Sequence, residues 1–140
     1  MSIHMTGRYK APNRRYSIDV PVNWQLRDGT ECLEISSPRG ETAITVTVFL
    51  QTRTNAETDA RKQLQRFLRS HKLRGQAESI VSSTPRAIAD FTDQKGNKWR
   101  AAIMSQSGIL LLATSVSAPK ARRDLNIAQE VIRGIRLRNH

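Results

Sequence analysis

The sequence predicts an α+β fold in which an antiparallel β-sheet lies between helices, in the order strands, helix, strands, helix. Apolar and polar residues alternate over 16–20, which is the period of a β-strand, and 41–51, 86–91 and 109–117 have the length and composition of further strands. Apolar residues instead recur every three or four residues over two other segments, 54–75 and 118–135, which is the period of a helix. With 140 residues, of which 38% are apolar, the chain fits one domain with one core.

Strands are expected to fill the first third of the chain. The first covers 16–20, and Pro21 ends it because proline has no N–H to donate to a ladder. We expect a turn over 27–30 and then a second strand over 32–36. The segment 41–51 is dense in β-branched residues, so we predict a long strand with both of its faces at least partly covered.

The first predicted helix covers 54–75. Thr54 and Glu57 have the spacing of a capping box, and Gly75 follows the last periodic residue. Its apolar residues include Leu64, which we expect in the core. Its polar side is rich in Arg and Lys.

The second half of the chain begins with a weak strand over 77–83 and a stronger one over 86–91. The segment 92–97 is typical of a hairpin turn, with Gly and Asn supplying unusual backbone dihedrals. Strands over 98–105 and 109–117 follow, and the second has apolar residues on both faces. Pro119 suits the first turn of a final helix, Gly134 suits its end, and 135–138 suits a short edge strand.

This order of elements and two short motifs resemble the superfamily that includes the photosystem protein PsbP, the Ran-binding Mog proteins and DcrB-type bacterial lipoproteins. The motifs are Tyr-Ser-Ile-Asp-Val-Pro-Val-Asn-Trp at 16–24 and Val-Ile-Arg-Gly-Ile-Arg-Leu at 131–137. The family often has Gly before the Trp, where this chain has Asn23, and Asn also tolerates a left-handed backbone. The resemblance implies a structural role for Pro21 and for Trp24, which would close one end of the core. The residues predicted to be structural are Pro21, Trp24, Val46, Val48, Leu64, Leu112 and Ile132.

The first residues of the chain look unlike the rest. An internal His-Met before Thr6 is typical of a vector-derived leader, so we assign 1–7 to a leader or a disordered N-terminus and 8–140 to one domain. If an upstream signal was removed, the expected location is the bacterial periplasm or envelope, as in a lipoprotein; otherwise it is the cytoplasm. No apolar run approaches the ~18–20 residues that span a membrane as a helix.

The sequence offers little of the chemistry that enzymes need. His71 is the one histidine away from the two ends of the chain, and the carboxylates are scattered. Cys32, the single cysteine, fits a small strand residue. No phosphate-binding loop, nucleophile elbow or metal motif occurs. We therefore predict no catalytic residue, no metal site and no cofactor, and an enzyme of unknown type is only the third hypothesis.

The basic residues carry the main functional hypothesis. The chain has 23 Lys and Arg against 12 Asp and Glu, a net charge of +11 that attracts anionic partners. The residues predicted to contact a partner are Arg61, Arg66, Arg69, Arg122 and Arg123. The alternative interpretation is that these residues form ordinary solvated surface.

The resemblance implies a non-catalytic binding or assembly domain, of the adaptor, chaperone or extrinsic-subunit type, whose partner is a protein, in particular an acidic one. The alternative is a nucleic-acid-binding domain that contacts phosphates through its basic helix faces, with non-specific binding at low salt. Single-strand recognition usually adds stacking aromatic residues, and the aromatic residues here are not gathered among the basic ones. The protein-binding hypothesis is therefore the main one.

Overall fold

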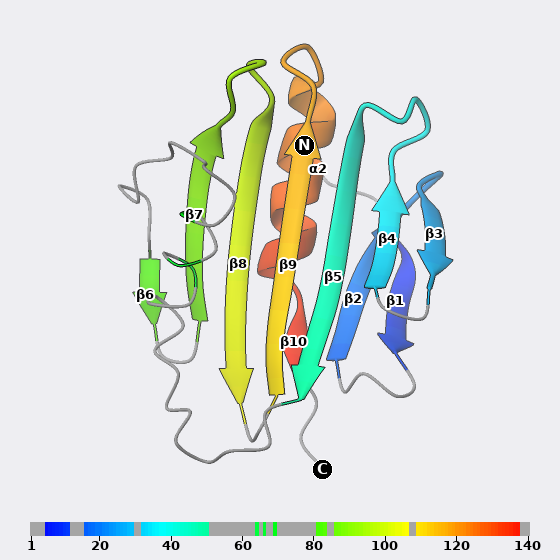
Figure 1. Ribbon diagram of the computed structural model, residues 1–140. Helices are drawn as coiled ribbons and strands as arrows, with labels where there is room; N and C mark the ends of the chain where they lie inside the picture. Colours follow the sequence, from blue (N-terminus) through cyan, green and yellow to red (C-terminus); the bar gives the residue numbers. More distant parts are fainter. Residues whose placement is uncertain are drawn as a thin grey trace.

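The computed structural model describes residues 5–11, 16–29, 32–50, 64, 66, 69, 81–83, 86–106 and 109–137. Within these residues, strands make two antiparallel sheets of different size (Figure 1). The helix α2 (Arg122–Arg133) and the smaller sheet lie on the same face of the larger sheet (Figure 1). The predicted α+β class with an antiparallel sheet is confirmed.

The larger sheet has seven strands in the order β3-β4-β5-β9-β8-β7-β6, and each neighbouring pair is antiparallel. Its strands are β3 (Gln25–Asp28), β4 (Cys32–Ser36), β5 (Thr42–Leu50), β6 (Val81–Ser83), β7 (Arg86–Thr92), β8 (Lys98–Gln106) and β9 (Ile109–Ser117). The strand β9 pairs along its whole length with β5 on one side and with β8 on the other. It is therefore the central strand, and the two strands of the 98–117 hairpin lie beside each other as the sequence predicted.

The smaller sheet contains both ends of the described chain. Its order is β1-β2-β10, formed by β1 (Met5–Ala11), β2 (Tyr16–Pro21) and β10 (Arg136–Leu137). Met5 pairs with Pro21 at one end of β2, and Leu137 pairs with Tyr16 at the other end. Residues 5–7, which we assigned to a leader or disordered N-terminus, thus lie in a strand that pairs with β2.

The main core lies between the larger sheet on one side and α2 with β2 on the other. From the sheet, alternate residues of β4, β5, β8 and β9 point into it, including Ile35, Val46 and Leu111. Helix α2 contributes Ala128, Val131 and Ile132. Each fully buried aliphatic side chain of this kind stabilises the fold by about 1.5–3 kcal/mol relative to an exposed one.

A second cluster lies on the opposite face of the larger sheet. The next residues along the same strands, Ala101 and Ile103 of β8, pack there with Ala87, Phe91 and the helical residue Leu64. Successive side chains of a strand point to opposite faces, so β8 and β9 are covered on both sides. This agrees with the two apolar faces that the sequence indicated for 109–117.

The residues predicted to be structural differ in burial. Pro21, Trp24, Val46, Leu64 and Ile132 are buried. Val48 and Leu112 are only partly buried, although each packs against one of the two clusters.

Helix α2 is fastened to the sheet at its carboxyl end. Arg86 of β7 donates hydrogen bonds to the carbonyl oxygens of Arg133 and Ile135, at 2.8 and 2.7 Å. The last carbonyls of a helix have no partner within the helix, and a guanidinium satisfies them while matching the negative end of the helix dipole. Partial burial lowers the pKa of Arg86, but the side chain stays charged because guanidinium groups do not deprotonate in proteins.

A half-buried ion pair ties the middle of α2 to the sheet. Arg100 of β8 binds Asp90 of β7 through two nitrogens, at 2.6 and 2.9 Å. A third nitrogen of Arg100 donates to the carbonyl oxygen of Gln129 in α2 at 3.4 Å. The planar fork of arginine matches a carboxylate in this two-point geometry.

Two expectations need correction. Residues 27–28 belong to β3 and not to a turn, because they pair with β4. The final helix begins at Arg122 and not at Pro119, because the chain first makes a turn in which Ala121 N–H donates to the carbonyl of Ala118 at 3.0 Å. The short edge strand expected over 135–138 is present as β10, at the edge of the smaller sheet beside β2.

Part of the first predicted helix falls outside the described residues. Leu64, Arg66 and Arg69 are helical, while the rest of 54–75, including Arg61 and His71, is not described. In the described part of the chain, no helix is long and apolar enough to cross a membrane.

The hairpin between β7 and β8 is built around Asp93. Its carboxylate accepts hydrogen bonds from the backbone N–H groups of Lys95 and Asn97, the Asn97 amide and the Trp99 indole. Gly96 takes the positive φ of 84° that the turn requires, as the sequence indicated, whereas Asn97 does not have a positive φ. The Trp99 indole, which also stacks on Phe91 at a centroid distance of 5.8 Å, is the main cause of a lowered pKa at Asp93.

We predict that Asp93 makes the stability of the domain depend on acid pH. Its pKa is lower in the folded than in the unfolded chain, so its ionised form stabilises the fold above the unfolded value of about 4. This contribution is lost as the pH falls through the folded pKa. Urea unfolding of wild type and Asp93→Asn from pH 7 downward should therefore show a difference in unfolding free energy that shrinks at acid pH. A difference independent of pH would contradict this.

Candidate functional site

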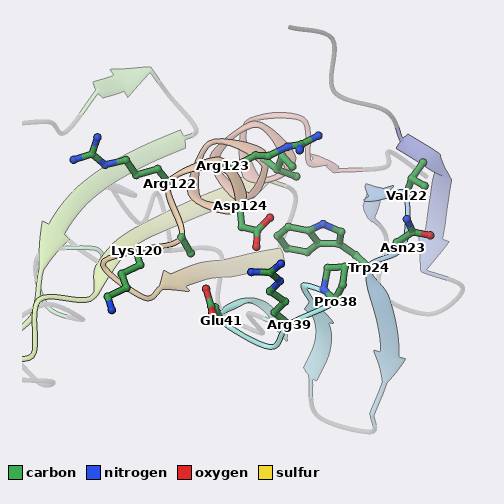
Figure 2. Close-up of a pocket in the computed structure, with 12 residues that line it drawn as sticks. Val22, Asn23, Trp24, Pro38, Arg39, Glu41, Lys120, Arg122, Arg123 and Asp124 are labelled. Atoms are coloured by element: carbon green, nitrogen blue, oxygen red, sulfur yellow. The ribbon is translucent and has the colours of Figure 1, made fainter.

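A pocket of about 490 Å³ lies at the amino end of α2 (Figure 2). Three segments line it: residues 22–24 after β2, residues 38–41 between β4 and β5, and residues 120–127 at the start of α2. This volume falls within the range of roughly 300–1,000 Å³ that is usual for ligand pockets. It is therefore the candidate functional site.

Backbone hydrogen bonds hold two of these segments together. Thr42 of β5 pairs with Ser117 of β9, and the next residue, Ala118, donates its N–H to the carbonyl of Glu41 at 2.9 Å. The β4–β5 turn is closed by Ser37, whose hydroxyl accepts from Thr42 N–H at 3.1 Å and whose carbonyl accepts from Gly40 N–H at 2.9 Å. The segment 38–41 is thus held next to the start of α2.

The third segment presents Trp24. The chain turns after β2 with a hydrogen bond from Trp24 N–H to the carbonyl of Pro21 at 3.2 Å, and Asn23 adopts a left-handed backbone with φ of 70°. Trp24 is 8% exposed and belongs to the main core cluster. The indole therefore fills one end of the core, and its remaining exposed edge forms part of the pocket wall.

The rim of the pocket carries charges of both signs. Its cations are Arg39, Lys120, Arg122 and Arg123, and its acidic residues are Glu41 and Asp124. Within the described part of the chain, none of the four cations is held in an ion pair. Figure 2 shows Arg39 and Asp124 directed toward Trp24, whereas Arg122 extends from α2 away from it. The rim has a net charge of +2 if all six groups are ionised.

The chemistry of the lining suits binding of an anionic group beside an apolar one. Four cations can meet carboxylates or phosphates, while Val22, Pro38, Trp24 and Ile127 provide apolar surface. In the described residues, no group of His, Cys, Asp and Glu side chains could hold a metal ion.

Comparison with solved structures identifies the architecture. The chain resembles the solution structure of cyanobacterial PsbP from Synechocystis, with a TM-score of 0.65 and 14% sequence identity, over 98% of this chain and 95% of that one. The fold is PsbP-like. The resemblance predicted from the sequence is thereby confirmed at the level of the fold.

The chain also resembles part of a crystal structure of a protein from Bacteroides thetaiotaomicron. The TM-score is 0.63 and the identity 15%, over 99% of this chain. This chain spans half the length of that protein. No protein-family model and no curated protein sequence matches the chain.

The PsbP-like fold brings together only some of the predicted contact residues. Arg122 and Arg123 both line the pocket and are exposed. Arg66 and Arg69 are exposed helical residues near Leu64, which packs on the opposite face of the larger sheet. Arg61 lies outside the described residues. The predicted arginines therefore do not form one surface.

The sequence did not single out Arg39, Glu41, Lys120 or Asp124 as site residues. Each lies in or beside a turn, and no sequence signal connects turns about 80 residues apart. The link between them is the long β5–β9 pairing, which brings Glu41 next to Ala118.

We predict that Trp24→Ala lowers the free energy of unfolding by about 3–5 kcal/mol, because it removes a large buried side chain from the end of the core. Equilibrium unfolding in urea measures this loss. Trp24→Phe, which keeps most of the apolar volume, should retain a clear part of the stability. A loss below about 1 kcal/mol for the alanine variant would show that the indole is not a core group.

We also predict that Asn23→Ala costs about 1 kcal/mol, because alanine is strained in the left-handed region, which the short polar side chain of Asn lets it adopt. Asn23→Gly also removes the amide but has no such strain, so it is the matched control and should be the more stable of the two. Thermal unfolding of both variants checks this order. The reverse order would contradict a strained left-handed backbone at residue 23.

Proposed function

We propose that this chain is a non-catalytic binding or assembly domain that docks a protein partner on the face around the pocket at the amino end of α2. The observation that carries the proposal is the pocket itself, in which two of the three lining segments bring together four cations that no ion pair within the described residues engages. Arg122 and Arg123, predicted as contact residues from the sequence, belong to this face.

The positive rim suits a role in steering and orienting a partner. The whole chain carries a net charge of +11, which raises the rate of encounter with an acidic surface. Exposed arginines at the edge of an interface mainly set the association rate and the choice of partner. The PsbP-like fold is compatible with an adaptor, chaperone or extrinsic subunit.

A protein partner fits the pocket better than a nucleic acid does. Proteins that bind single strands stack bases on accessible aromatic side chains, but Trp24 is almost completely buried. The carboxylates of Glu41 and Asp124 would repel a closely spaced row of phosphates. The exposed aromatic residue Phe49 is not part of the pocket lining.

The test compares two double variants that change the net charge equally. Arg122→Glu/Arg123→Glu alters the pocket face, and Arg66→Glu/Arg69→Glu alters exposed residues near the opposite face of the sheet. Each purified protein is immobilised and exposed to nuclease-treated extract of its source organism at moderate salt. We expect one stoichiometric protein retained by wild type and by the Arg66/Arg69 variant, and lost from the Arg122/Arg123 variant.

Other outcomes would count against the proposal. Equal loss from both variants would mean that retention depends on overall charge and not on this face. Retention from a parallel extract without nuclease treatment but not from the treated one, together with binding of a labelled oligonucleotide that weakens steeply with salt, would favour a nucleic-acid-binding domain. Failure of wild type to retain any protein would remove the support for a docking face.

A further inference from the structure

We infer that the pocket takes a short extended peptide segment that places one apolar side chain on the surface formed by Pro38, Ile127 and the exposed edge of Trp24, and carboxylates against Arg39 and Arg123. This inference rests on the proposed function and specifies which chemical groups of the partner bind at the same site. It follows from the apolar surface of the pocket, from the distribution of its cations and from the acidic residues among them.

The apolar part of the pocket accepts an uncharged side chain. Val22, which lines the pocket, is 45% exposed, and the part of Trp24 that stays exposed also belongs to the lining. Pro38 and Ile127 add apolar surface from the two other segments. Covering this surface with an aliphatic or aromatic side chain removes it from water, which favours binding by about 25 cal/mol for each Å².

The cations approach this apolar surface from different elements. Arg39 comes from the β4–β5 turn and Arg123 from α2, and Figure 2 shows them on different sides of Trp24. Two carboxylates on either side of an apolar residue of an extended chain match this arrangement, because arginine binds carboxylates in a two-point geometry.

The acidic residues of the lining narrow the choice of ligand. Glu41 and Asp124 lie among the four cations, so the pocket is not uniformly positive. A polyphosphate or nucleic-acid backbone would place negative charge next to both of them. A peptide avoids this cost because it can place a neutral or basic residue opposite Asp124 while its own carboxylates meet the arginines.

The experiment selects peptides from a displayed library of random heptapeptides on the purified full chain at moderate salt. Enriched peptides are then synthesised with a fluorescent label, and their affinity is measured by anisotropy. The variants are Arg39→Glu, Arg123→Glu and Val22→Asp, with Arg66→Glu/Arg69→Glu as the control for charge. Arg39, Arg123 and Val22 are exposed, so these changes should leave the fold intact, which circular dichroism verifies.

We expect enriched peptides with an apolar residue flanked by Asp or Glu. Their affinity should fall at least roughly tenfold for each pocket variant, the effect of losing about 1.4 kcal/mol, and remain within about twofold in the control. The inference is overturned if the library yields no such peptides, or if the pocket variants bind them as tightly as wild type. It is also overturned if a labelled single-stranded oligonucleotide competes for the same residues at moderate salt.

The result separates this inference from the proposed function. If capture of a partner protein depends on Arg122 and Arg123 but no acidic peptide binds, the proposed function is supported. The docking face then binds the surface of a folded protein and not an extended peptide. If neither experiment depends on the pocket, the proposed function fails together with the inference.

Discussion

The short connection between β9 and α2 determines where both the core and the pocket lie. Residues 118–121 make one turn, so α2 must fold back over the strand that it has just left. Its apolar residues then meet Leu111 and Ala113 of β9, and its first turn lies beside the end of the β5–β9 pair. Any longer connection would let α2 cover other strands and would separate Arg123 from Arg39. The pocket is therefore a consequence of how the core is closed.

The sequence predicted the central strands and α2 well because their patterns come from burial. Along β7 and β9 buried and partly buried residues alternate, because successive side chains point to opposite faces of the sheet, and most of β5 follows the same pattern. The strands β1 and β3 escaped prediction because they lie at sheet edges and are held by backbone hydrogen bonds to β2 and β4. Residues such as Arg27 and Asp28 carry no apolar signal, so pairing alone makes them a strand. The first residue of α2 could not be predicted from the sequence either, because Pro119 is compatible both with a turn and with the first turn of a helix.

The candidate site was visible in part. Arg122 and Arg123 stood out as charged residues on a helix that has no other use for them, whereas Arg39 was only one residue of a predicted turn. Joining these residues requires the strand order β4-β5-β9, in which segments far apart in the chain become neighbours. Arg66 and Arg69 show the converse, that residues which look alike in the sequence need not lie together. Like Arg122 and Arg123 they are exposed helical arginines, but the larger sheet separates their helix from α2.

Met5 and Leu137, the first and last described residues, pair with opposite ends of β2, and this has a consequence for how the domain can be tethered. Met5 lies at the Pro21 end of β2, next to the segment that presents Val22 and Trp24, and Leu137 lies at the Tyr16 end. An anchor joined upstream of β1 would hold the pocket close to its point of attachment. One joined downstream of β10 would instead turn the pocket outward. In the first case the docking face would bind a partner that lies near the anchor. In the second case it would bind a partner that lies away from the anchor.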